Sequence, residues 1–205
     1  MKITDFNKGI ISSSLGSFWW GFLGTYYFQY ITFVGTIEVV VHRCIWTSLM
    51  LLITTTFFNK WYLLKKIIFD KKKLLILLIT SILIFGNWSI WIYAVATNRI
   101  IDASFGYFIF PIISVFFGFL FFNEKLNKKR IISISLVIIS TIYLFFNLNS
   151  FPWIGFSVAF LWSIYNLLRK KINVDTDIGL FIESLFIFPI AIVIFYFIFQ
   201  NNMND

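Results

Sequence analysis

Long apolar runs separated by short polar connections constrain the fold of this chain more than any other feature. A helix needs about 20 largely apolar residues to cross a bilayer. Seven runs meet or approach that length, at roughly 9–30, 36–58, 74–96, 103–122, 130–147, 152–168 and 178–199. The sequence therefore predicts an all-α integral membrane protein with about seven transmembrane helices.

The composition excludes the main alternatives to a membrane protein. Of the 205 residues, 60% are hydrophobic and 13% are charged, whereas soluble domains carry about 25% charged residues. A soluble core of this size would not bury 28 Phe and eight Trp. A single cysteine, Cys44, excludes a disulfide-rich secreted scaffold. The net charge of +8 does not indicate nucleic-acid binding, because the lysines lie in connections between apolar runs.

The basic residues lie almost entirely in alternate connections. Fifteen of the 17 Lys and Arg residues fall within 1–8, 59–73, 123–130 and 169–171, whereas Arg99 alone lies in the remaining connections. By the positive-inside rule, the basic connections face the cytoplasm. We therefore expect a cytoplasmic N-terminus and an external C-terminal segment. The first run lacks an Ala-x-Ala cleavage site, so we expect it to be retained as a helix.

Charged side chains inside the second run are the first functional candidates, because each costs about 2.5–3.5 kcal/mol at the bilayer centre. This run carries Glu38, His42 and Arg43. Glu38 and His42 are four residues apart and share a helix face, whereas Arg43 points elsewhere and should find its partner on another helix. Two interpretations stay open. The three residues belong to a pore or binding site, or Glu38 lies in the headgroup layer and Arg43 snorkels.

Further candidates lie at a similar depth in other runs. Asn87 and Tyr107 fall in the outer half of the membrane, and Pro111 falls roughly 12 Å deep at a rise of 1.5 Å per residue. Proline frees a backbone carbonyl there and bends the helix. The alternative is structural, with Pro111 as a kink and Asn87 as an interhelical hydrogen bond. Trp20 and Trp162 are the aromatic candidates for lining a path, because both lie at mid-depth.

Catalytic and metal chemistry find little support in the sequence. There is one histidine and one cysteine, so His/Cys metal clusters are excluded. We find no Gly-x-Ser-x-Gly nucleophile motif and no Gly-rich phosphate loop. We therefore expect no enzyme, no cofactor and no metal site.

The sixth and seventh runs resemble the first and second. Residues 17–21 (Ser-Phe-Trp-Trp-Gly) align with 159–163 (Ala-Phe-Leu-Trp-Ser), and Glu38 aligns with Glu183. Five spans separate the two sets, so their orientations are opposite, as in the inverted repeats of many secondary transporters. The pattern predicts a first five-helix repeat over 1–147 and the first two helices of a second repeat over 148–205.

The chain also resembles the RarD-type permeases of the EamA branch of the drug/metabolite transporter superfamily, over essentially its whole length. The string Ala103-Ser-Phe-Gly-Tyr-Phe-Ile-Phe-Pro111 carries the resemblance most specifically. The other matching segments are Trp20-Gly-Phe-Leu23, Glu38-Val-Val-Val-His-Arg43 with Trp46, Asn87-Trp88 with Ala94-Val95, Gly118, Glu124 and Leu126, Pro152-Trp153, Tyr165, Leu168-Arg-Lys170, Gly179-Leu180, Glu183 and Pro189. Gly24 stands where the family usually has Pro, and Phe110 stands where it usually has Asn.

The resemblance implies a ten-helix permease of the bacterial inner membrane that moves small metabolites or drugs, in a family linked by name to chloramphenicol sensitivity. This sequence would supply seven of those helices. The implied partners are a small-molecule substrate and the lipid bilayer, with a homodimer left open and nucleic acid excluded. The alternative is a truncated, non-transporting membrane protein that folds or acts only with a partner.

The residues expected to contact substrate or a coupling ion combine the candidates above. We expect Arg43 to steer an anionic group and Glu38 to carry a coupling proton. The full set is Trp20, Glu38, His42, Arg43, Asn87, Tyr107, Pro111, Trp162 and Glu183.

Overall fold

The computed structural model describes residues 5–148 and 150–204, and the elements assigned there are all helices. Their bounds are α1 (Asp5–Phe18), η1 (Trp19–Gly24), α2 (Thr25–Tyr30), α3 (Thr36–Phe57), α4 (Trp61–Ile68), α5 (Lys71–Ala96), α6 (Ile100–Phe122), α7 (Lys128–Phe146), α8 (Trp153–Ile172) and α9 (Thr176–Asn204). Each of the seven apolar runs forms a helix. The prediction of an all-α membrane protein is confirmed.

Five of the described helices are long and apolar enough on their own to cross a membrane: α3, α5, α6, α7 and α9. The first run is one continuous helical segment, but the π-helical turn η1 divides it between α1 and α2. The other remaining run forms α8, whose last turn carries three basic residues.

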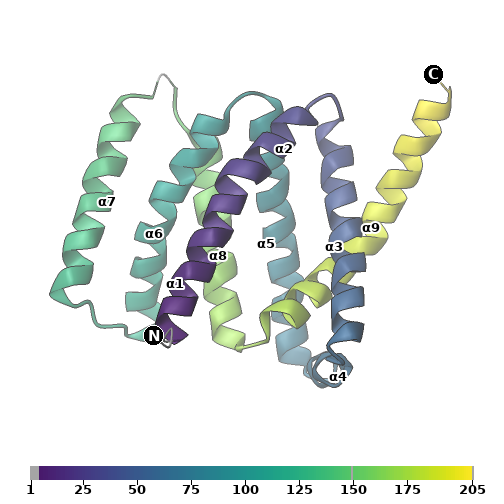
Figure 1. Cartoon of the computed structure of the whole chain (residues 1–205), viewed down its shortest axis with the longest axis horizontal. Coiled ribbons are helices and arrows are strands. Elements are labelled where there is room, and N and C mark those ends of the chain that lie inside the picture. The colour runs from purple at the N-terminus through teal and green to yellow at the C-terminus, as the bar shows by residue number, and fades with distance from the viewer. Residues whose placement is uncertain (1–4, 149, 205) are drawn as a thin grey trace.

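The helices pack side by side around α5 (Figure 1). One group consists of α6 and α8, which contact each other extensively, with α7 beyond α6. The other group consists of α3 and α9, and both of them also contact α5. The main buried cluster lies where α3, α5, α8 and α9 meet, and it includes Val41, Ala94, Val158 and Ala191. Packing of this kind brings side chains from both ends of the sequence to one place.

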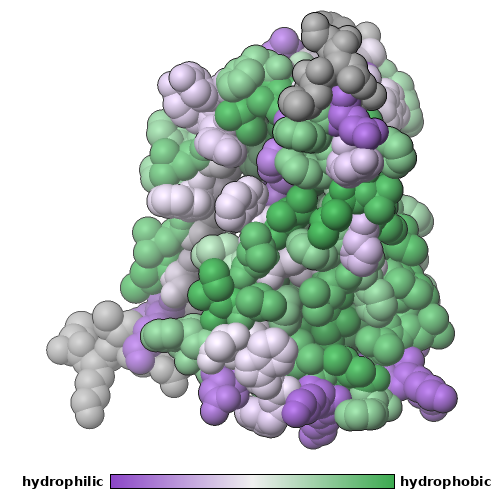
Figure 2. Space-filling view, turned by 90° about the vertical axis from the view of Figure 1, so that its right-hand side faces the viewer, coloured by the Kyte–Doolittle hydropathy of each residue, from purple (hydrophilic) through white to green (hydrophobic). Residues whose placement is uncertain are grey.

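The basic connections lie at one end of the helix bundle, which we call the lysine-rich end. Figure 1 places the start of α1, the helix α4, the α6–α7 connection and the α8–α9 connection there. Arg99 lies in the α5–α6 connection, at the opposite end. Between the two ends the surface is mainly hydrophobic, and hydrophilic residues gather toward the lower and upper edges of the face in Figure 2. This distribution suits a chain whose middle faces lipid.

The connection between the second and third runs contains a helix that the sequence analysis did not predict. Helix α4 has eight residues, and it buries Leu64 and Ile67 while Lys65 and Lys66 stand in its last turn. Helix α5 then begins at Lys71, three residues before the predicted start, because the Asp70 side chain accepts a hydrogen bond from the Lys73 backbone N–H at 3.2 Å. An N-cap of this type satisfies a backbone donor that the first turn leaves free. The same hydrogen bond lowers the pKa of Asp70.

Helices α6 and α8 cross at two glycines. A Cβ atom built on Gly106 would lie 2.5 Å from the carbonyl oxygen of Gly155. The two backbones therefore touch, an approach that only residues without a side chain permit. This close crossing fixes where α6 and α8 present their neighbouring side chains.

Candidate functional site

A cavity of about 480 Å³ lies between η1 and helices α3, α5, α6, α8 and α9, and we call it the central cavity. It contains five of the nine predicted site residues: Trp20, Arg43, Asn87, Tyr107 and Trp162. The complete lining is Trp20, Arg43, Ile84, Asn87, Trp88, Trp91, Tyr107, Val158, Trp162, Tyr165, Asn166, Thr176 and Leu180. Its size falls within the range of small-molecule sites, about 300–1,000 Å³.

Arg43 reaches this cavity from α3 and is surrounded by aromatic rings. Its guanidinium carbon lies 4.2 Å from the ring centre of Trp88. The corresponding distances are 5.1 Å to Trp20 and 5.7 Å to Phe28. These contacts lie on other segments, as predicted, but they are aromatic faces. Among the described residues, no carboxylate forms an ion pair with Arg43.

The π-helical turn η1 positions Trp20. The indole ring of Trp20 packs against Gly24, where an added Cβ would lie 3.2 Å from a ring carbon. The ring centre lies 5.1 Å from that of Trp91, and Trp20 Nε1 donates a hydrogen bond of 3.4 Å to Tyr107 Oη. Short π-helical turns occur frequently at functional sites, because they redirect side chains within a helix. The apolar run predicts a helix here without revealing this change.

Asn87 and Trp162 line the cavity from α5 and α8. Asn87 Nδ2 donates a hydrogen bond of 3.1 Å to the backbone carbonyl of Val158. This is the interhelical bond that the structural alternative predicts. Trp162 stacks on Tyr165, with ring centres 5.1 Å apart and an interplanar angle of 15°. Sequence analysis did not select Tyr165, because aromatic residues near helix ends are usually interface anchors.

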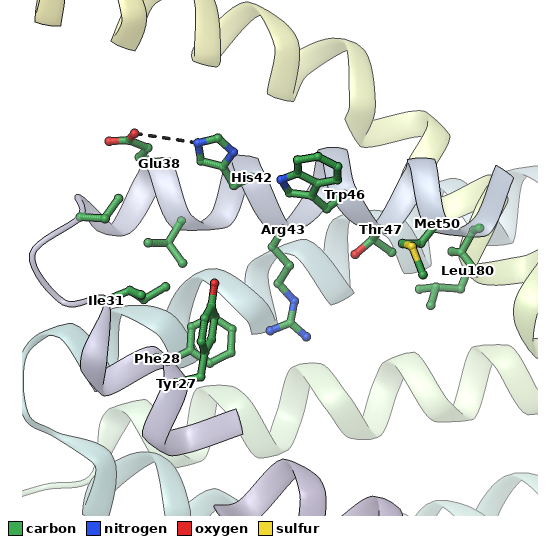
Figure 3. A pocket seen from close by; sticks show the side chains of 13 residues that line it. Tyr27, Phe28, Ile31, Glu38, His42, Arg43, Trp46, Thr47, Met50 and Leu180 are labelled. Atoms are coloured by element: carbon green, nitrogen blue, oxygen red, sulfur yellow. Dashed lines mark ion pairs between the residues drawn. The ribbon is translucent and has the colours of Figure 1, made fainter. Parts of the chain in front are cut away.

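A second cavity of about 790 Å³ lies between α2, α3 and α9, and we call it the lateral cavity. Its lining residues are Tyr27, Phe28, Ile31, Val34, Glu38, Val39, His42, Arg43, Trp46, Thr47, Met50, Leu51 and Leu180. Figure 3 shows Glu38 and His42 on one side of α3 and Arg43 on another, as their spacing predicts. Arg43 and Leu180 line both cavities.

Glu38 and His42 form a loose pair within the lateral cavity. His42 Nε2 lies 3.9 Å from Glu38 Oε1, and both side chains are partly exposed. The His42 ring also packs edge-on against Phe195 of α9, with ring centres 5.2 Å apart. The structure therefore separates these two residues from the central cavity.

Glu183 and Pro111 line neither cavity. Glu183 is fully buried and accepts hydrogen bonds from Thr80 Oγ1 at 2.6 Å and Tyr165 Oη at 3.1 Å. Its Oε1 also lies 3.6 Å from Nε of Arg169. Pro111 stands inside α6.

Arg169 is the partner that sequence analysis missed, because it begins an Arg-Lys-Lys run at a helix end and was assigned to a solvated connection. A carboxylate within an apolar run needs a nearby cation, and this requirement of Glu183 is the signal that could have indicated Arg169.

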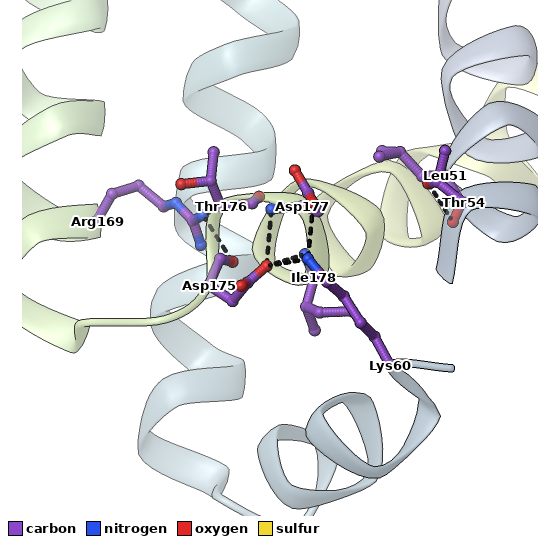
Figure 4. Close-up of polar contacts among 8 residues, drawn as sticks. All are labelled: Leu51, Thr54, Lys60, Arg169, Asp175, Thr176, Asp177 and Ile178. Carbon is purple, nitrogen blue, oxygen red and sulfur yellow. Dashed lines mark hydrogen bonds and ion pairs between the residues drawn. The ribbon is translucent and has the colours of Figure 1, made fainter. Parts of the chain in front are cut away.

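Ion pairs connect separate helices at the lysine-rich end. Lys60 Nζ lies 2.8 Å from Asp177 Oδ2 and 3.5 Å from Asp175 Oδ1 (Figure 4). The hydrogen bond to Asp177 is the main reason that the pKa of Lys60 is raised. Across the molecule, Lys170 pairs with Glu124 and lowers the pKa of that carboxyl. These pairs join α9 to the α3–α4 connection and α8 to the α6–α7 connection.

The chain is similar in sequence to several curated transporters. The chain is 31% identical over 201 residues to an uncharacterized transporter of Vibrio cholerae. This alignment covers 98% of this chain and 66% of the relative. It is 30% identical over 204 residues to the protein RarD of Escherichia coli, covering 100% of this chain and 69% of RarD. The uncharacterized transporter YojE of Bacillus subtilis is 31% identical over 207 residues, covering 100% of this chain and 68% of YojE.

The chain thus spans about two thirds of the length of these curated relatives. No solved structure matches it significantly. Residues 7–146 match the EamA-like transporter family, which is a family of transporters rather than enzymes. With its apolar helices and its similarity to RarD over the whole of its own length, this chain is a multi-pass membrane protein that belongs to the EamA-like transporter family.

Proposed function

We propose that the chain acts as a secondary transporter, or as most of one, which moves small metabolites or drugs across the bacterial inner membrane. The observation that carries this proposal is the central cavity around Arg43, formed by several spans of a transporter-family protein. Transporters of this general type bind cargo between helices near the middle of the membrane and expose it to each side in turn.

The orientation and the repeat belong to the same proposal. The lysine-rich end faces the cytoplasm, together with the N-terminus, in accordance with the positive-inside rule. Helices α1–α7 form the first repeat, and α8 and α9 begin an inverted second one. In support of this, Trp20 and Trp162, which the repeat alignment pairs, both line the central cavity.

The ion pairs at the lysine-rich end act as a closed gate in this proposal. Lys60 holds the start of α9, and Lys170 holds the α6–α7 connection. Arg169 and Glu183 form a buried pair nearby. Opening the cavity toward the cytoplasm requires these contacts to separate as α8 and α9 move against the other helices. In this proposal, the gate is closed at the cytoplasmic side.

Proton coupling is assigned to Glu38, which faces the lateral cavity beside His42. Glu38→Gln keeps the shape of the side chain and removes its proton site. We expect this variant to lose the pH dependence of uptake into vesicles while the protein stays folded. Unchanged pH dependence would exclude the coupling role.

Reconstituted vesicles provide the test of transport itself. The purified chain is incorporated into liposomes, and uptake of small anionic, neutral and cationic aromatic compounds, including chloramphenicol, is compared with uptake by empty liposomes. We expect saturable uptake of at least one class. A folded protein that gives no uptake of any class would favour the alternative, a non-transporting membrane protein that acts only with a partner.

A further inference from the structure

We propose that Arg43 and the tryptophans around it form a binding subsite for a small aromatic carboxylate. The inference rests on the proposed function, since the bound carboxylate would be the cargo of the transporter. It assigns a substrate class to the central cavity.

Among the residues whose side chains the structure describes, the charge of Arg43 has no counter-ion. Each of the seven carboxylates whose side chains the structure describes lies within 4.0 Å of a Lys, Arg or His other than Arg43. The pairs are Glu38 with His42, Asp70 with Lys73, Asp102 with Arg99, Glu124 with Lys170, Asp175 and Asp177 with Lys60, and Glu183 with Arg169. A cation within the apolar part of a membrane protein is costly unless it has a partner. A bound anion would supply that partner.

The guanidinium donors of Arg43 are also uncommitted within the described part of the chain. Arg43 donates none of the hydrogen bonds found among the described residues, although a guanidinium carries five N–H donors. The aromatic faces of Trp88 and Trp20 attract the cation but accept no ordinary hydrogen bond. Because Arg43 lines both cavities, its donors are reachable from open space. A carboxylate matches this fork in a bidentate arrangement.

Several other polar side chains of the cavity wall already donate hydrogen bonds within the protein. Asn87 Nδ2 donates to Val158, Asn166 Nδ2 donates to Trp162, and Tyr165 Oη donates to Glu183. Arg43 is the one charged side chain among the described residues that line the cavity, and it therefore provides the main polar recognition. The rest of the wall consists largely of flat rings, which stack well on another ring. The walls thus suit a molecule with one anionic group and a planar apolar body, and they disfavour a cation.

Binding measured in nanodiscs of neutral phosphatidylcholine tests this proposal. The probes are phenylacetate, its neutral analogue phenylacetamide and the cation phenethylamine, with tryptophan fluorescence and calorimetry as readouts. We expect phenylacetate to bind about 10- to 100-fold more tightly than phenylacetamide, as for the loss of one charge-assisted contact. Equal binding of the two probes, or no binding of phenylacetate, would overturn the proposal.

Variants locate the preference. Arg43→Gln should remove the discrimination between phenylacetate and phenylacetamide, and Arg43→Lys should keep part of it. Lys65→Gln, on α4 and outside both cavities, is the matched control and should bind as the wild type does. Discrimination that persists in Arg43→Gln would place the anion elsewhere. If Arg43→Gln does not fold, Trp162→Leu tests the site instead. This variant should weaken the binding of phenylacetate and of phenylacetamide by a similar factor. Unchanged binding of the two probes would contradict the site.

Two further comparisons separate the possible sources of failure. Adding phosphatidylglycerol to the nanodiscs should leave phenylacetate binding unchanged. Loss of binding would show that Arg43 takes a lipid phosphate, which overturns the cargo assignment. Selective phenylacetate binding without uptake into liposomes would contradict the transport function and leave the subsite intact. Uptake of neutral compounds without anion selectivity would support the transport function and contradict the carboxylate subsite at Arg43.

Discussion

The crossing of α6 and α8 leads to a sharp prediction about Gly106. In Gly106→Ala, the new methyl group would lie 2.5 Å from the carbonyl oxygen of Gly155, whereas ordinary contacts begin near 3.4 Å. The two helices must therefore separate locally by about 0.9 Å. The atoms in the way belong to backbone, so no side chain can rotate to make room. The central cavity, which both helices line, must change shape as well.

The expected cost follows from two opposing effects. Overpacking a well-packed contact costs about 1–3 kcal/mol, while replacing glycine by alanine inside a helix returns up to about 1 kcal/mol. We expect a net loss of about 1–2 kcal/mol in the free energy of unfolding. In a chain of this size each kcal/mol lowers the melting temperature by about 2–4 °C. Thermal unfolding of the detergent-purified protein, followed by tryptophan fluorescence, measures this shift.

Gly86→Ala provides the matched control. Gly86 lies on α5 and faces α8, but its added methyl group would meet only Leu161 Cδ1, at an ordinary 3.6 Å. This variant should melt at the wild-type temperature or above it. A Gly106→Ala protein as stable as Gly86→Ala would refute the close crossing of α6 and α8.

The remaining predictions concern the carboxylates. Glu183→Ala leaves Arg169 buried without its partner and should lower the unfolding free energy by about 3–5 kcal/mol. The double variant Glu183→Ala/Arg169→Ala should recover part of this loss. A double variant as unstable as Glu183→Ala alone would contradict the pairing. Lys170 lowers the pKa of Glu124 from its ordinary 4.5, so their pair stabilises the fold above that pH and is lost as the pH falls through the lowered pKa. The melting temperatures of wild type and Glu124→Gln should therefore differ at neutral pH and converge in acid, and a pH-independent difference would contradict the pair.

The sequence predicts the helices well because bilayer thickness and loop charge restrict them strongly. All seven apolar runs are helical, and their basic connections share one end. Helix α4 was missed because eight amphipathic residues in a lysine-rich connection carry no spanning signal. The early start of α5 depends on one cap, Asp70, whose hydrogen bond an apolar pattern does not reveal.

The candidate site was predicted in part. Helical spacing separates Arg43 from Glu38 and His42, and the structure assigns them to different sides of α3. The convergence of Trp20 and Trp162 depends on long-range packing and on the π-helical turn, which no local pattern indicates. The partner of Glu183 lies 14 residues away, within a basic run whose other members remain exposed. Tertiary contacts of this kind do not follow from the periodicity of one segment.

The central claim is that the cavity around Arg43 opens in turn to the two sides of the membrane. The most direct test measures the labelling of a single cysteine by a membrane-impermeant thiol reagent in right-side-out and inside-out vesicles. Ile84 lines the central cavity, so Ile84→Cys introduces the reporter cysteine there. The background variant Cys44→Ser removes the native cysteine. Lys125→Cys, in the α6–α7 connection, marks the side that the proposed orientation assigns to the cytoplasm. We predict that the cysteine at 84 reacts from both sides and the one at 125 from the cytoplasm alone; reaction of the cysteine at 84 from one side only would contradict the account.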